Sequence, residues 1–153
     1  MTRPFLILAF LSVLACATPA LHAQRERTAS DEIEYVDKTW PGTKKTSTGM
    51  RYLIRHEGHG ASSKPGDLVS VLYTGTLPDG TVFDTNVGKS PFEFKLGDGH
   101  VIPGFERGVL GMKVGGKRRV TIPPDLAYGK RGVPPKIPPG SILVFDIELL
   151  AIR

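Results

Sequence analysis

The sequence that decides the fold is Val71-Leu72-Tyr73-Thr74-Gly75-Thr76-Leu77-Pro78-Asp79-Gly80-Thr81-Val82-Phe83-Asp84. Residues 68–77 are rich in Val, Leu, Tyr and Thr, which are mostly residue types that favour β-strands. Pro78-Asp79-Gly80 follows, and Asp-Gly accepts the positive φ that a tight turn requires. Residues 81–83 then return along the first strand, so the stretch predicts a β-hairpin.

Short strands are predicted on both sides of this hairpin. Residues 50–55 alternate with the period of a half-buried strand, and further strands are predicted at 91–94, 117–122 and 142–152, with loops at 58–66 and 125–140. Residues 103–112 are the one good helix candidate, because Phe105, Val109 and Met112 form a single apolar stripe. Many short strands with one short helix predict an α+β domain, with a mostly antiparallel sheet packed on that helix.

Composition agrees with this class. The chain has 153 residues, which suggests one domain. It contains 18 Gly and 13 Pro, and this content favours a turn-rich fold over a helical bundle. The net charge of +5 is spread along the chain except at Lys117-Arg118-Arg119. We interpret that run as a solvated strand end, because a nucleic-acid site needs a basic face with a reading element behind it.

The N-terminal 23 residues are typical of a signal peptide. Arg3 precedes an apolar run at 5–15, which is too short to span a bilayer. Small residues occur at the end of the apolar run and after it, and they fit cleavage after Ala23 or after Ala17. Val13-Leu14-Ala15-Cys16 also resembles a bacterial lipobox, so lipidation of Cys16 is a third alternative that would tether the protein to a membrane.

Two further segments follow the signal peptide. Residues 24–48 are polar and mixed in charge, and we interpret them as a linker with a short ordered stretch around Ile33, Tyr35, Val36 and Trp40. The domain is expected to comprise residues 49–153. Because Cys16 is the only cysteine, this domain can have no disulfide and depends on its core for stability.

The sequence lacks the usual catalytic motifs. His56 and His59 lie near Glu57, but a metal site usually needs a third ligand at a defined distance, and His100 is alone. No serine has the context of a nucleophile elbow, and no glycine-rich phosphate loop is present. An enzyme of this sequence must therefore act without acid, base, nucleophile or metal, and rotation about an imide bond is one such reaction.

Four further segments accompany the hairpin stretch. They are Pro91-Phe92-Glu93-Phe94-Lys95-Leu96-Gly97, Val101-Ile102-Pro103-Gly104-Phe105-Glu106, Ala127-Tyr128-Gly129 and Leu143-Val144-Phe145-Asp146-Ile147-Glu148-Leu149-Leu150. In this order and spacing, the chain resembles the FKBP-type peptidyl-prolyl cis/trans isomerases, or macrolide-binding immunophilins, over about residues 47–152.

The resemblance implies an antiparallel half-barrel sheet wrapped around one short helix, with an aromatic pocket between them. Carried over to this chain, it implies catalytic roles for Tyr73, Phe83, Asp84, Phe105, Tyr128 and Phe145, and substrate binding by Phe92, Val101, Ile102 and Ile137. It implies no metal and no cofactor. The expected partners are proline-containing polypeptides and tacrolimus-type macrolides, with no nucleic acid. At the rim of the implied pocket, Lys136 and Val133 differ from the residues usual in the family. This difference affects which ligands the rim prefers.

The expected function is isomerisation of X-Pro bonds during the folding of exported proteins, in the periplasm or after secretion. The alternative is a non-catalytic module that holds proline-containing segments. Some exported members of this family carry a long N-terminal helical dimerisation segment. Only about 25 polar residues separate the predicted signal peptide from the domain here, so we expect a monomer.

Overall fold

The structure is a computed structural model that describes residues 29–153. Its main sheet is antiparallel and has the strand order β1-β2-β8-β9-β4-β5, with β6 paired to the other end of β4. These strands are β1 (Lys44–Lys45), β2 (Arg51–His56), β4 (Leu68–Thr76), β5 (Val82–Thr85), β6 (Phe92–Lys95), β8 (Lys117–Ile122) and β9 (Leu143–Ile152). Strands β3 (His59–Ser62) and β7 (Lys113–Val114) form a second small sheet. The helices are α1 (Ala29–Thr39), α2 (Pro103–Val109) and the 3-10 helix η2 (Pro124–Leu126).

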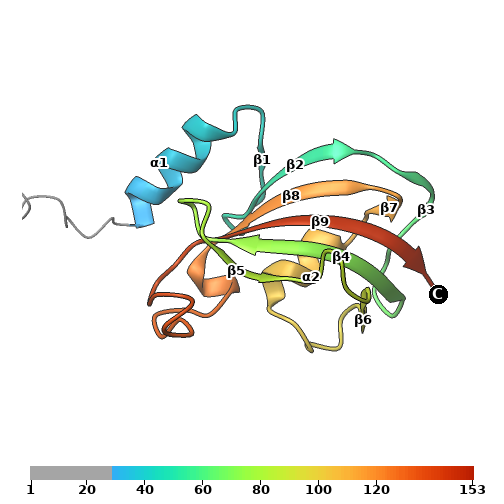
Figure 1. Ribbon diagram of the computed structural model, residues 1–153. Helices are drawn as coiled ribbons and strands as arrows, with labels where there is room; N and C mark the ends of the chain where they lie inside the picture. Colours follow the sequence, from blue (N-terminus) through green and yellow to red (C-terminus); the bar gives the residue numbers. More distant parts are fainter. Residues whose placement is uncertain (1–28) are drawn as a thin grey trace, which may run out of the picture.

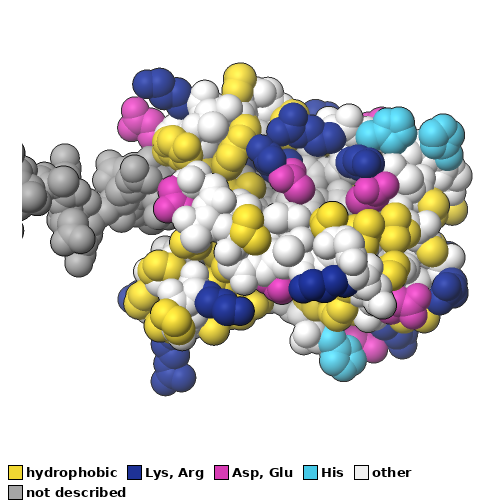
Figure 2. Space-filling view, viewed as in Figure 1, with side chains coloured by type: hydrophobic (Ala, Val, Ile, Leu, Met, Phe, Trp, Pro, Cys, Tyr) yellow, Lys and Arg dark blue, Asp and Glu magenta, His cyan; other side chains and the backbone are white. Residues whose placement is uncertain are grey.

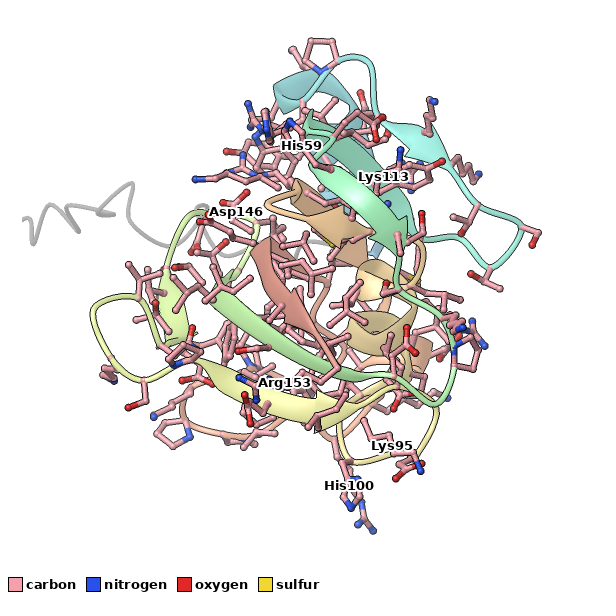
Figure 3. All side chains as sticks on the ribbon, turned by 90° about the vertical axis from the view of Figure 1, so that its right-hand side faces the viewer. His59, Lys95, His100, Lys113, Asp146 and Arg153 are labelled. Carbon is pink, nitrogen blue, oxygen red and sulfur yellow. The ribbon has the colours of Figure 1, made fainter. Side chains whose placement is uncertain are left out.

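The main sheet curves around α2 (Figures 1 and 3). Phe105 and Val109 bury one face of this helix in the core. Gly104 and Gly108 allow a close approach, because a Cβ atom at Gly104 would lie 2.1 Å from Cγ2 of Ile122 on β8. This arrangement confirms the α+β fold that the sequence predicts.

The predicted hairpin is formed by β4 and β5. Gly75 pairs with Asp84, and the Leu77 N–H donates to the Thr81 carbonyl at 2.9 Å across the turn. Gly80 has φ +91°, as the Asp-Gly turn requires. The hairpin therefore brings Tyr73 of β4 next to Asp84 of β5.

Two elements differ from the sequence-based expectations. Helix α2 ends at Val109 and not at Met112, because the chain leaves the helical conformation at Leu110, with ψ 130°, and Gly111 follows with φ +75°. The segment 58–66, expected to be a loop, contains β3, which pairs with β7. At the start of this segment, Gly58 lies so close to Gly116 that a Cβ atom at Gly58 would be 2.5 Å from the Gly116 nitrogen. Such pairing between distant segments leaves no local pattern in the sequence.

Helix α1 lies in the segment that we interpreted as a linker. Val36 is fully buried, and the Arg51 guanidinium donates to both carboxylate oxygens of Asp37. Trp40 lies under the Arg119 guanidinium at 4.9 Å. The ordered part of this segment is thus longer than the short stretch expected around these residues, because the helix gains its stability from packing on the sheet.

The basic run on β8 has local partners. The Lys117 ammonium pairs with Glu148 at 3.1 Å, and the Arg119 guanidinium donates to Asp146 at 2.8 Å. Arg118 donates to the carbonyl of Gly108 at 2.9 Å, near the end of α2. Figure 2 shows basic and acidic side chains next to one another over β2, β8 and β9. The charges of this run thus serve contacts within the domain.

The predicted signal peptide, with the alternative lipidation site Cys16, lies outside the described residues. Within residues 29–153, no helix is both long and apolar enough to cross a bilayer.

Candidate functional site

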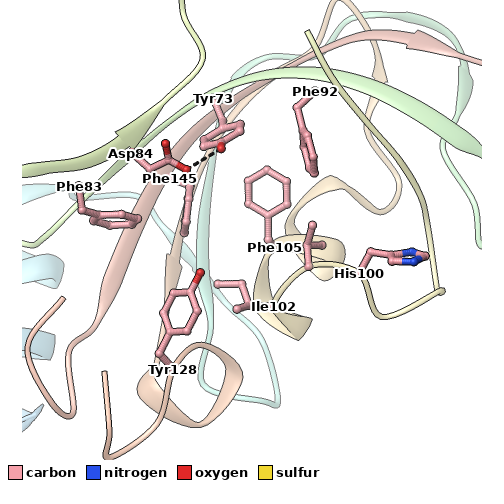
Figure 4. A pocket seen from close by; sticks show the side chains of 10 residues that line it. Tyr73, Phe83, Asp84, Phe92, His100, Ile102, Phe105, Tyr128 and Phe145 are labelled. Carbon is pink, nitrogen blue, oxygen red and sulfur yellow. Dashed lines mark hydrogen bonds between the residues drawn. The ribbon is translucent and has the colours of Figure 1, made fainter. Parts of the chain in front are cut away.

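A cavity of about 400 Å³ opens between the sheet and the start of α2. Aromatic side chains from the four strands β4, β5, β6 and β9, from α2 and from the loop after η2 converge on it (Figure 4). Its lining residues are Tyr73, Phe83, Asp84, Phe92, His100, Val101, Ile102, Phe105, Tyr128 and Phe145. Elements that are far apart in the sequence therefore build one largely aromatic pocket.

Phe105 and Phe145 form the buried part of the pocket. Their exposed fractions are 4% and 5%, and their ring centroids lie 5.1 Å apart in an edge-to-face arrangement. The Tyr73 ring meets Phe105 at 5.4 Å, and the Phe83 ring meets Phe145 at 5.5 Å. Aromatic rings favour such edge-to-face contacts, so the rings pack against one another and make the buried part of the pocket apolar.

Gly75 is required for this packing, although the sequence did not single it out. A Cβ atom at Gly75 would lie 2.6 Å from the Phe83 ring and 2.8 Å from the Phe145 ring. Glycine in the interior of a strand is often a sign that another group approaches the backbone closely. That signal is present in Tyr73-Thr74-Gly75-Thr76, and two pocket rings approach the strand there.

One carboxylate faces the pocket. The Tyr73 hydroxyl donates to Oδ2 of Asp84 at 2.6 Å (Figure 4). Burial raises the pKa of the Tyr73 hydroxyl above its ordinary value, and the hydrogen bond and negative charge of Asp84 raise it further. A raised pKa favours the protonated form, so Tyr73 stays neutral and remains a donor to Asp84 across the physiological range.

The ionisation of Tyr73 gives a first test of this geometry. In a spectroscopic titration, the difference between the wild type and Tyr73→Phe reports the Tyr73 phenolate. We expect its midpoint to lie above the ordinary tyrosine value of about 10, and to move towards that value in Asp84→Asn, which removes the negative charge. A midpoint unchanged by Asp84→Asn would show that the carboxylate does not act on Tyr73.

The rim of the pocket is more exposed. Phe92 and Tyr128 have exposed fractions of 37% and 41%. The Tyr128 hydroxyl points towards the cavity, whereas the His100 ring points away from Phe105 (Figure 4). The rim therefore offers the Tyr128 hydroxyl beside an exposed aromatic side chain, which suits a ligand with an apolar ring and a carbonyl group.

The structure brings together nine of the ten site residues expected from the sequence. The tenth, Ile137, has an exposed fraction of 5% and belongs to the core, and its backbone pairs with Val133 across a tight loop. His100 joins the lining although it had no expected role. Within residues 29–153, no group of three or more His, Cys, Asp or Glu side chains is arranged to hold a metal ion.

Comparison with known proteins identifies relatives over this same region. Residues 60–150 match the family model described as FKBP-type peptidyl-prolyl cis-trans isomerase. FK506-binding protein 2 of Yarrowia lipolytica is 51% identical over 109 residues, which are 71% of this chain and 76% of that protein.

Longer relatives and a solved structure also match this chain. FK506-binding protein 4 of Rhizopus delemar is 54% identical over 96 residues, which are 63% of this chain. The matched region spans only 25% of that relative and 26% of a second FK506-binding protein 4, from Neurospora crassa. The crystal structure of FkpA from Escherichia coli superposes with a TM-score of 0.72 at 45% identity, and the match covers 81% of this chain and 58% of FkpA.

Proposed function

Because the chain belongs to the FKBP-type peptidyl-prolyl cis-trans isomerase family, we propose that it catalyses cis/trans isomerisation of X-Pro bonds in its aromatic pocket. The observation that carries this proposal is the convergence of Tyr73, Phe105 and Phe145 around a cavity of about 400 Å³. A proline ring and its preceding peptide bond fit a cavity of this size and apolar character.

The reaction needs no proton transfer. X-Pro bonds isomerise over tens to hundreds of seconds, because rotation breaks amide resonance against a barrier of about 18–20 kcal/mol. The planar amide carries more charge separation than the twisted transition state. An apolar pocket therefore disfavours the planar form relative to the twisted one, and a tight fit to the twisted shape adds to this preference. A barrier lowered by about 5 kcal/mol gives a several-thousandfold acceleration.

We propose the following roles within this pocket, as the family resemblance implies them. Phe105 forms the floor beneath the proline ring, and Phe83, Phe92 and Phe145 form its walls. The Tyr128 hydroxyl, which points into the cavity, donates to a substrate carbonyl. The main chain at Val101 and Ile102 provides hydrogen bonds to the peptide. Asp84 orients Tyr73, with which it shares the 2.6 Å hydrogen bond.

The setting of this activity is a separate part of the proposal. The charged start, apolar run and small residues of the first 23 positions support export, either to a periplasm or by secretion, with lipidation at Cys16 as an alternative. Residues 24–48 lie between this segment and the expected domain at 49–153, and their helix α1 and strand β1 pack on that domain. We propose a monomer. The substrates are then proline-containing segments of exported proteins, and tacrolimus-type macrolides compete for the same pocket. Size-exclusion chromatography with light scattering tests the monomer, and a stable dimer contradicts it.

A protease-free isomerisation assay on short X-Pro peptides tests the activity. We expect the purified protein to accelerate exchange and tacrolimus to block it. Tyr128→Phe is expected to lower kcat/KM about five- to tenfold, which is the loss of one hydrogen bond of about 1 kcal/mol. Stability should change little, because Tyr128→Phe removes only the hydroxyl of a side chain that is 41% exposed.

Two outcomes would count against these assignments. A folded protein that binds the peptides without accelerating exchange would favour the non-catalytic holding module. Full activity of Tyr128→Phe would remove the donor role of that hydroxyl and leave the aromatic pocket as the sole contributor.

A further inference from the structure

The edge of β4 beside the pocket has a gap in its strand pairing. Strand β5 pairs with β4 at residues 74–76, and β6 pairs with it at residues 68–71. Between these two paired stretches, the loop at residues 86–91 connects β5 to β6 and turns away from the edge of β4. Asn86, the only asparagine in the sequence, lies at this gap and is 9% exposed.

The Asn86 side chain fills the gap as a peptide group would. Its Oδ1 accepts from the Tyr73 N–H at 2.7 Å, and its Nδ2 donates to the Val71 carbonyl at 3.0 Å. Its backbone N–H donates to the Tyr73 carbonyl at 3.2 Å. A carboxamide carries the same acceptor and donor as a peptide unit. It therefore continues the ladder of β4 where neither neighbouring strand supplies a main-chain partner.

These bonds connect two walls of the pocket. Asp84 lies on β5, two residues before Asn86, and Phe92 lies after Asn86 at the start of β6. The Asn86 Nδ2 also lies 3.4 Å from the Ser90 carbonyl, at the returning end of the loop. Tyr73, which Asn86 holds on the opposite side, bonds Asp84 and packs against Phe92 with 6.1 Å between ring centroids.

We propose that Asn86 is a positioning residue for the isomerase site. It fixes the backbone of Tyr73 and the separation of the Asp84 and Phe92 walls, without itself lining the cavity. This inference rests on the proposed isomerase function. Asparagine is required because both halves of its amide are used. Serine is too short to span both contacts, and an ionised aspartate cannot donate to the Val71 and Ser90 carbonyls.

A carboxylic acid provides a reversible test of this role. At about pH 7.5, Asn86→Asp places a negative oxygen against two carbonyl oxygens, and we expect kcat/KM to fall about tenfold. Burial and these carbonyls raise the pKa of the introduced carboxyl. The protonated acid regains a donor and an acceptor in the shape of asparagine, so activity at about pH 5 should return to within about threefold of the wild type at the same pH.

The charged groups near this position are few. Asp84 lies two residues away, and the Lys89 ammonium donates to the Thr85 carbonyl at 3.2 Å. Both are present in every variant, so the ratio of Asn86→Ala to the wild type at each pH shows how activity depends on pH without a carboxyl at position 86. Asn86→Ala, which cannot regain either bond, is the matched control and should stay about tenfold impaired at both pH values. Circular dichroism at the assay temperature shows whether each variant is folded.

The outcomes separate this inference from the proposed function. If the wild type is active, full activity of Asn86→Ala overturns the inference, and so does an Asn86→Asp profile that parallels the alanine variant. If the wild type is inactive, the proposed function fails, and amide exchange then tests Asn86 alone. Exchange of the Tyr73 N–H should accelerate at least about tenfold in Asn86→Ala, and unchanged protection would overturn the positioning role.

Discussion

Phe105→Ala is expected to lower kcat/KM about a hundredfold, which corresponds to about 2.7 kcal/mol of lost transition-state stabilisation. The Phe105 ring is 4% exposed and contacts Tyr73 and Phe145 at 5.4 and 5.1 Å between centroids. Its removal opens the floor of the pocket to water, and water stabilises the planar amide. The same change leaves a cavity in the core and is expected to cost about 3–5 kcal/mol of stability. The isomerisation assay and urea denaturation measure the two effects.

Phe94→Ala is the matched control for this loss. Phe94 is also 4% exposed and contacts Phe105 at 5.7 Å, but it does not line the cavity. We expect a similar loss of stability and less than about a tenfold loss of kcat/KM. Equal losses of activity in the two variants would show that Phe105 acts through the stability of the core and not through the pocket floor.

Gly104→Ala is expected to destabilise the fold by about 3 kcal/mol or more, because it overpacks a rigid contact. The new Cβ atom would lie 2.1 Å from Cγ2 of Ile122. Ile122 is fully buried at the end of β8 and cannot move aside. Helix α2 must then shift away from the sheet, and Phe105 shifts with it, so activity should fall as well. Urea denaturation of the purified variant measures the change in the free energy of unfolding.

Two further variants show whether the close contact is the cause. Gly108→Ala places its Cβ atom 3.2 Å from the Val120 methyl groups on the same face of α2. This milder contact is offset by a gain in helix propensity of about 1 kcal/mol, so a small net effect is expected. The double variant Gly104→Ala/Ile122→Ala removes the clashing atoms and should be less destabilised than the sum of the single changes. Strict additivity would contradict the clash.

The hairpin and the helix that frame the pocket follow from local patterns. Asp79-Gly80 specifies a turn through its backbone preference, and Pro103 with the apolar stripe of Phe105 and Val109 specifies the start of α2. All ten site residues came from the family resemblance, and nine of them line one cavity. The buried location of Ile137 was not foreseen, because a Pro-rich loop has no periodicity from which to infer which side chains face inward.

Helix α1 shows the opposite case. Its sequence is polar and short, and a helix of this length is marginal when isolated. It forms against the sheet, where Val36 is buried and Asp37 meets Arg51. Nothing in residues 24–48 alone indicates those partners.

The sequence by itself therefore determined the fold class, the hairpin and the central helix, because turn chemistry and hydrophobic periodicity act between near neighbours. It also pointed to the family, through the resemblance that its segments carry in order. The tertiary structure decided the rest. It showed that Gly75 makes room for two aromatic rings, that Asn86 closes the gap in β4, and that α1 packs on the sheet. Each of these contacts joins residues that come close only in the completed fold. The role of each residue therefore depends on its contact with another segment and not on a local conformational preference.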